Sequence, residues 1–314
     1  MTLPGPAIAI VGPTASGKST LADLVALELD GDVVSVDAMQ VYRGMDIGTA
    51  KTPAEERKVA LRMIDVCDVD MDYSVQLYQQ ECRGIVDEEL DRGLTPVLCG
   101  GTGLYLNAVI DEMVFPSGEK GDKQRSAYEA MAEGLGADGL HALLEERDPA
   151  SAALIHPNNV RRVVRALEML DEGKSYAEHN KGLRKRAPHY EARIWGLNMD
   201  RARLYARIEQ RVDQMMAEGL LDEVRSLMDA GLNRESTAGQ AIGYKEILDY
   251  LDGDCTLDEA VSAIKTRTRR YAKRQISWFK NDGRVRWLDL DKMSVEEARD
   301  IVLADLAGRT GGEA

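Results

Sequence analysis

Residues Gly12 to Ser19 carry the clearest chemical pattern in this sequence. They read Gly-Pro-Thr-Ala-Ser-Gly-Lys-Ser, match the spacing GxxxxGK[ST], and follow the apolar run Ala7–Val11. The glycines of such a loop let backbone N–H groups turn toward an anion, and the helix that follows adds its positive end. We therefore predict a phosphate-binding loop before a helix that begins near Lys18. In this loop Lys18 supplies a positive charge and Ser19 reaches a Mg²⁺ ion.

The spacing alone does not identify the molecule whose phosphate groups the loop would bind. A nucleoside triphosphate and an organic diphosphate present the same oxygens to the loop.

Two further polar residues follow expected strands. Asp37 ends the β-rich run 33–37, and Thr102 follows the run 96–99 within Gly-Gly-Thr-Gly. Parallel strands end at one edge of a sheet, so both side chains are expected beside the phosphate loop. Asp37 could hold magnesium, accept a proton from an attacking nucleophile, or cap a loop. Thr102 could contact reacting groups or cap the next helix.

The elements that must position these residues alternate between short β-rich runs and helical stretches. Further runs, 194–197 and 285–290, continue the alternation and predict an α/β fold: a P-loop-type, mostly parallel sheet flanked by helices. Between residues 115 and 190 no convincing strand occurs, and Glu, Lys, Ala and Leu dominate. We predict an all-helical insertion domain at 115–190, between two parts of a catalytic core, 1–114 and 191–314.

Composition narrows the class of protein. The chain has 314 residues, 30% charged and 44% hydrophobic, which excludes wholesale disorder and a disulfide mini-protein. Its four cysteines are too far apart for a CxxC pair, and no His completes a zinc-finger spacing, so we expect reduced thiols without a structural metal. The aliphatic run at 7–11 is far shorter than the ~18 residues that span a bilayer. We expect a cytoplasmic monomer that makes no membrane contact.

The net charge of −14 argues against indiscriminate nucleic-acid binding but permits a local basic surface. Residues 264–280 contain seven Lys or Arg and no acid. A helical projection gathers Ile264, Tyr271, Ala272, Trp278 and Phe279 on one face. The basic residues flank that face in two stripes, Lys265, Arg269, Lys273 and Lys280 on one side and Arg267, Arg270 and Arg274 on the other. The stripes are either a solvated face or a phosphate-backbone contact.

Arginines recur elsewhere at helical spacing. Arg161, Arg162 and Arg165 lie on one side of an expected helix and could contact the same phosphate backbone. The projection places Arg211 at the edge of an apolar face that includes Ile208. An inward-leaning arginine needs an anionic partner, which could be a buried carboxylate or a bound ligand.

Together with the segments 43–51, 156–159, 161–168, 240–246 and 273–280, the phosphate loop and the two strand-end motifs closely resemble the tRNA dimethylallyltransferase family, also called tRNA isopentenyltransferases. The motifs occur in family order from residue 12 to residue 280. Ala38 stands where many members have Ser, and Ser277 where Thr is common.

The resemblance implies transfer of a dimethylallyl group from dimethylallyl diphosphate to N6 of adenine 37, next to the anticodon, in tRNAs that read codons beginning with U. It implies that Asp37 is the general base and that Thr102 contacts the reacting groups. Magnesium at Ser19 is the expected cofactor. The implied diphosphate-binding residues are Gly12, Thr14, Ala15, Ser16, Gly17, Lys18, Ser19 and Arg211.

The implied partner is the tRNA anticodon stem-loop, from which the target base must be extruded. The residues that the resemblance and the basic stripes assign to tRNA are Asp37, Ala38, Met39, Gln40, Arg161, Arg162, Arg165, Gln240, Gly243, Lys245, Lys273, Arg274, Gln275, Trp278 and Lys280.

Three other functions share part of these features. A small-molecule P-loop kinase would use the phosphate loop and the aspartate, and a free-nucleotide prenyltransferase would use the same chemistry. Neither needs basic helices. A non-catalytic RNA-binding NTPase switch would hydrolyse nucleotide without changing RNA.

Overall fold

The computed structural model describes residues 6–115, 123–184 and 187–310. Its sheet has six strands in the order β3-β2-β4-β1-β5-β6, and every pairing is parallel. This confirms the predicted α/β fold with a mostly parallel sheet. The strands are β1 (Ala7–Val11), β2 (Val33–Ser35), β3 (Leu61–Arg62), β4 (Val97–Gly100), β5 (Ala192–Asn198) and β6 (Arg286–Asp289).

Two strand expectations need correction. The run 33–37 is a strand only to Ser35, so Asp37 lies in the loop beyond it, and the strand expected at 96–99 runs from Val97 to Gly100. Sequence inspection also missed β3, which pairs two residues with β2 at the edge of the sheet. A two-residue strand is too short to show a period in the sequence.

Strand β1 lies in the middle of the sheet and is buried along its whole length. Its register sets Ile10 beside Cys99 of β4 and Trp195 of β5. Alternate side chains of β1 enter different apolar clusters, with Ile8 and Ile10 in one and Ala9 and Val11 in the other. Helices must cover both faces of such a sheet, which explains why its strands read as continuous apolar runs.

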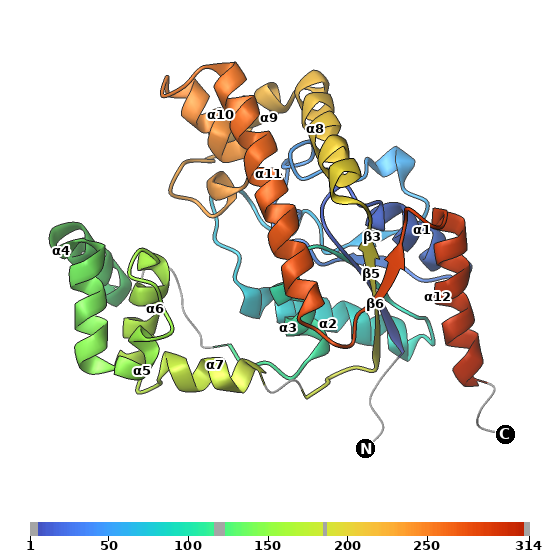
Figure 1. The fold of residues 1–314 in the computed structure, drawn as a ribbon, viewed down its shortest axis with the longest axis horizontal. Coiled ribbons are helices and arrows are strands. Elements are labelled where there is room, and N and C mark those ends of the chain that lie inside the picture. The colour runs from blue at the N-terminus through green and yellow to red at the C-terminus, as the bar shows by residue number, and fades with distance from the viewer. Residues whose placement is uncertain (1–5, 116–122, 185–186, 311–314) are drawn as a thin grey trace. The chain divides into compact units, whose positions relative to one another are not determined.

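The helices of the core follow the strands. They are α1 (Lys18–Glu28), α2 (Val75–Asp91), α3 (Gly103–Ile110), α8 (Arg201–Glu218), α9 (Leu220–Asp229), α10 (Tyr244–Leu251), α11 (Leu257–Lys280) and α12 (Val295–Thr310), with short 3-10 turns η1 (Ala54–Glu56) and η2 (Ala238–Gln240). In Figure 1 the long helix α11 and helix α8 extend beyond the sheet, and α12 packs beside α1. None of the described helices is long and apolar enough to cross a membrane.

Residues 112–187 form a second compact unit, compared with the 115–190 expected from the sequence. Its described part is helical: α4 (Lys123–Arg147), α5 (Pro149–Ala152), α6 (Val160–Asp171) and α7 (Tyr176–Arg184). The unit has its own apolar core, which includes Leu140, Leu144, Val163 and Leu167. A core of its own makes this stretch a compact unit in its own right.

Candidate functional site

The predicted phosphate-binding loop connects β1 to α1, and the helix begins at Lys18, as the spacing predicts. Gly17 is the N-cap and has a φ of 95°, a conformation that glycine adopts without strain. Ala15 also has a positive φ, 62°, and its carbonyl oxygen accepts a 2.8 Å hydrogen bond from Arg207 Nε. Helix α8 thus helps to hold the loop in its turned conformation.

Ser16, in the same loop, carries an unpaired polar group. Its side-chain oxygen is buried and has no hydrogen-bond partner among the described residues. A buried hydroxyl without a partner costs free energy, and a phosphate oxygen would supply the missing acceptor. This orphaned hydroxyl therefore fits a loop that binds an anion.

Lys18 and Arg211 both line a cavity of about 340 Å³ beside the loop. Burial lowers the pKa of Lys18, and the charge of Arg211 lowers it further. Burial and the charge of Arg207 likewise lower the pKa of Arg211. Within the described part of the chain, no carboxylate forms an ion pair with either residue. The buried carboxylate that was one of the two expected partners of Arg211 is thus not paired with it in the described structure.

Asp37 and Thr102 line the same cavity, one beyond β2 and the other beyond β4. Asp37 Oδ1 accepts a 2.9 Å hydrogen bond from the backbone N–H of Met39, so the predicted loop cap exists. Thr102 occupies the N-cap position of α3, but its side chain does not cap that helix. Its Oγ1 instead accepts a 3.1 Å hydrogen bond from the backbone N–H of Ala38. Thr102 thereby holds the segment that carries Asp37.

Tyr271 is a cavity residue that the sequence placed only on an apolar helix face. Burial raises the pKa of its hydroxyl to about 12, and the charge of Asp37 contributes. The guanidinium of Arg274 lies 5.5 Å from the centre of the Tyr271 ring, within cation–π range. The only signal in the sequence was that Arg274 follows Tyr271 by three positions, which places the two side chains next to each other on one helix.

Gln275, which the resemblance assigns to tRNA binding, is a buried residue that lines the cavity. The residue is only 4% exposed. Its Oε1 accepts a 2.9 Å hydrogen bond from Thr14 N, and its Nε2 donates to the Gly101 carbonyl at 3.1 Å. A Cβ at Gly101 would lie 2.0 Å from that Nε2, so the close approach requires glycine. Gln275 joins the phosphate loop to the loop after β4.

The basic stripes of α11 are partly neutralised within the protein. Lys265 pairs with Asp213 at 2.5 Å, Arg267 pairs with buried Glu246 at 2.5 Å, and Arg269 pairs with Glu209. The acids come from α8 and α10, which sequence inspection did not connect with this helix. The basic residues of the stripes that are exposed and form no ion pair in the described structure are Arg270, Lys273, Arg274 and Lys280.

Trp278 does not share the buried face of α11. Ile264, Ala272 and Phe279 are each at most 2% exposed, whereas Trp278 is 42% exposed. Its indole ring lies against the backbone of Gly103, where a Cβ would come within 2.1 Å of the ring. The residue therefore presents an aromatic edge at the surface next to Thr102.

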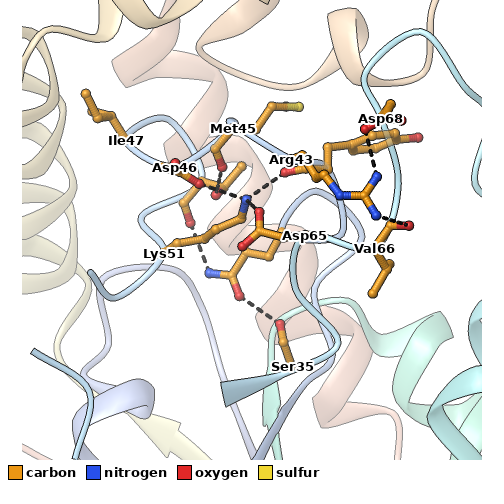
Figure 2. Close-up of polar contacts among 12 residues, drawn as sticks. Ser35, Arg43, Met45, Asp46, Ile47, Lys51, Asp65, Val66 and Asp68 are labelled. Carbon is orange, nitrogen blue, oxygen red and sulfur yellow. Dashed lines mark hydrogen bonds and ion pairs between the residues drawn. The ribbon is translucent and has the colours of Figure 1, made fainter. Parts of the chain in front are cut away.

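A charged cluster supports the loop that runs from Gln40 to Lys51 along one wall of the cavity. Figure 2 shows the Lys51 ammonium between two carboxylates, at 2.9 Å from Asp46 Oδ1 and 2.5 Å from Asp65 Oδ1. Lys51 Nζ also donates to the Tyr42 carbonyl at 2.6 Å, and its side chain is only 2% exposed. These three acceptors satisfy a buried cation. The sequence showed Lys51 in a motif without indicating this role.

The other residues assigned to tRNA lie in both units. Gln240 and Gly243 line the cavity, and Lys245 Nζ donates to Gln240 Oε1 at 3.2 Å. In the unit formed by residues 112–187, Arg161 and Arg162 are exposed on α6. Arg165, on the same helix, pairs with Glu168 at 3.3 Å.

A sequence model of the IPP transferase family matches residues 40–282. The chain belongs to this family. Among curated relatives of this IPP transferase, the tRNA dimethylallyltransferase of Carboxydothermus hydrogenoformans is 45% identical over 300 residues, which are 95% of this chain and 96% of the relative. That of Geobacillus kaustophilus is 47% identical over 283 residues, which are 90% and 89% of the two chains.

Solved structures agree with this IPP transferase over nearly its whole length. The tRNA isopentenylpyrophosphate transferase of Bacillus halodurans has a TM-score of 0.70 at 43% identity and covers 96% of this chain and 97% of its own. A eukaryotic dimethylallyltransferase, described as acting on tRNA, has a TM-score of 0.80 at 28% identity and covers 96% of this chain and 79% of its own.

Proposed function

We propose that this chain transfers a dimethylallyl group from dimethylallyl diphosphate to N6 of adenine 37 in tRNAs that read codons beginning with U, and releases diphosphate. The observation that carries the proposal is that one cavity brings an anion site, Lys18 and Arg211, together with Asp37 and Thr102. Membership of the IPP transferase family and the names of the relatives support the same activity.

The anion site would act on the leaving group. As the bond between C1 and the diphosphate oxygen breaks, negative charge grows on the diphosphate. Lys18, Arg211, the Ser16 hydroxyl and the N-terminus of α1 would stabilise that charge. Because burial and a neighbouring cation, Arg211 for Lys18 and Arg207 for Arg211, already lower both pKa values, an anionic ligand beside them would relieve an existing cost.

Asp37 would act on the nucleophile. The lone pair of the adenine N6 amine is delocalised into the ring, so N6 attacks C1 better when a carboxylate accepts its proton. Because the loop turn uses only Asp37 Oδ1, Oδ2 is available for that proton. Thr102 keeps the Asp37 segment in place through Ala38 N.

Ser19 would hold Mg²⁺, which we propose as the cofactor. The described residues contain no cluster of three or more His, Cys, Asp or Glu side chains that could hold a metal. Mg²⁺ does not need such a cluster, because it commonly keeps water and phosphate oxygens as ligands beside one or two protein groups. When bound, the ion would supply positive charge to the leaving diphosphate.

The exposed cations of α11 and α6 would bind the tRNA backbone. Arg270, Lys273, Arg274 and Lys280 on α11 form no internal ion pair in the described structure, although the whole chain is acidic. Phosphate contacts of this kind supply affinity without reading sequence. We place the reaction in the cytoplasm and propose that one chain carries it out as a monomer.

The direct test incubates the protein with an unmodified tRNA, dimethylallyl diphosphate and magnesium, followed by mass analysis of the nucleosides. A dimethylallyl group on adenine 37 is the expected result, and a tRNA with guanine at position 37 is the control. ATP hydrolysis without a change in the RNA would favour an NTPase switch. Prenylation of free adenine nucleotide in preference to tRNA would favour the free-nucleotide transferase.

A further inference from the structure

Glu223, on α9, inserts its carboxylate into a turn of the cavity wall. Its Oε2 accepts hydrogen bonds from the backbone N–H groups of Asp46 at 3.0 Å and Ile47 at 2.7 Å. Its Oε1 accepts from Gly48 N at 3.2 Å and from the Tyr244 hydroxyl at 2.6 Å. Successive backbone N–H groups form a concave anion site, and here a side chain of the same protein fills it.

A buried cation, Lys51, also contacts this turn. Asp46 donates its backbone N–H to Glu223 and gives its carboxylate to Lys51, so one residue connects the two charges. Figure 2 shows the Asp46 carboxylate beside the Lys51 ammonium. Hydrogen bonds to charged groups are stronger than neutral ones, so Glu223 and Lys51 both hold the turn firmly.

The turn is connected to the catalytic segment by Gln40. Thr49, directly after the three N–H groups, accepts a 3.2 Å hydrogen bond from Gln40 Nε2 through its carbonyl oxygen. Gln40 Oε1 in turn accepts from the Ser35 hydroxyl at 2.7 Å. Because Ser35 can donate and the Thr49 carbonyl can only accept, the orientation of the amide is determined. Gln40 lies three residues after Asp37 and lines the cavity.

Tyr244 and Gly48 hold the same turn against helix α10. Tyr244 is fully buried, and a Cβ at Gly48 would lie 2.5 Å from its ring. A displacement of Glu223 would therefore release the Tyr244 hydroxyl and the three backbone groups together.

We propose that Glu223 is a positioning residue for the transfer step. It fixes the turn at residues 46–48, and through Thr49 and Gln40 it fixes the segment that carries Asp37. This inference rests on the proposed transferase function, because Asp37 is the group whose placement it controls.

The first experiment compares Glu223→Gln with the wild-type protein in single-turnover transfer. The substitution keeps the size of the side chain but removes the charge that binds three N–H groups. We expect a rate loss of roughly tenfold with little change in tRNA affinity. The matched control is Asp222→Asn, because Asp222 is an exposed neighbour that pairs with Arg225. We expect this control to transfer at the wild-type rate.

Hydrogen exchange gives a readout that does not depend on activity. The amides of Asp46, Ile47 and Gly48 should exchange roughly tenfold faster in Glu223→Gln than in Asp222→Asn. Faster exchange with an unchanged transfer rate would overturn the inference, because Glu223 would then hold the turn without positioning Asp37. Unchanged exchange would overturn it as well. If Glu223→Gln exchanged faster but the wild-type protein itself transferred no dimethylallyl group, the proposed transferase function would be wrong, and the role of Glu223 in holding the turn would stand.

A double-mutant cycle with Gln40→Ala separates positioning from general stability. If Glu223 acts through Gln40, the double variant should be no slower than the slower single variant. If the rate losses of the two single variants instead multiplied in the double variant, Glu223 would not act through Gln40. Should Glu223→Gln fail to fold, Tyr244→Phe removes one donor to the same carboxylate. It should slow transfer by roughly twofold to fivefold, and a wild-type rate would count against the inference.

Discussion

The hydroxyl oxygen of Thr102 accepts a 3.1 Å hydrogen bond from the backbone N–H of Ala38. This bond joins the loop after β4 to the loop after β2, which lie on adjacent strands of the sheet. It also leaves the N-terminus of α3 without a side-chain cap from Thr102. A residue that would ordinarily stabilise its own helix instead holds the segment that carries the proposed base.

Asp37→Asn should lower the single-turnover rate by roughly 10²- to 10⁴-fold while tRNA still binds, because the amide cannot accept the N6 proton. The Oδ1 hydrogen bond from Met39 N can be kept, so the loop turn should survive. The measurement is transfer under saturating tRNA over a range of magnesium concentrations. A loss of about tenfold or less that excess magnesium repairs would show that Asp37 serves a metal.

Lys18→Ala should slow the step that expels diphosphate more than it weakens tRNA binding. Lys18 forms no ion pair in the described structure, so its charge is available for the developing anion. Single-turnover rates and tRNA binding are measured on the same preparation. If the variant keeps its rate and loses only tRNA affinity, the cavity is not where the diphosphate leaves.

Arg270→Ala combined with Lys273→Ala should reduce affinity for all tRNAs and flatten the salt dependence. The slope should fall by roughly 0.7 to 0.9 for each tRNA phosphate that the helix no longer neutralises. Both residues are exposed on α11. Arg269→Gln is the matched comparison, because Arg269 already pairs with Glu209 and should affect the salt slope less. An equal slope in the double variant and the wild type would make α11 a merely solvated helix.

Glu89 should make the free energy of unfolding depend on pH. The residue is 1% exposed and neither carboxylate oxygen has a hydrogen-bond partner among the described residues. Burial raises its pKa from 4.5 to about 7, and nearby Asp32 contributes. Because the folded pKa lies above the unfolded one, stability from this group is complete below about pH 4.5 and is lost as pH rises through about 7.

Glu89→Gln should remove that dependence, because glutamine carries no charge. The variant should gain up to about 3 kcal/mol over the wild type at pH 8 and little near pH 4. Urea unfolding at both pH values provides the measurement. The neighbouring, exposed Glu88→Gln is the control, and the same gain there would remove burial as the cause.

Local spacing in the sequence was enough to predict several elements of this protein. The phosphate loop, the start of α1 at Lys18 and the apolar β1 depend on residues next to one another. Such patterns can be recognised because backbone conformation and strand burial impose their own short periods. The parallel fold followed from the alternation of these segments, and the family followed from motifs in a constant order.

The partners of charged and polar side chains were decided only by the tertiary structure. The sequence indicated no ion-pair partner for Arg267 or Arg269, yet each forms an ion pair with a glutamate on another helix. Gln275 reaches Thr14, 261 residues away, and Glu223 reaches Ile47, 176 residues away. A polar group buried in folding must find a partner, and packing determines which distant group is in reach. No local sequence pattern specifies which distant groups come into contact. The pairings that shape this cavity are therefore set by the packing of the helices against the sheet.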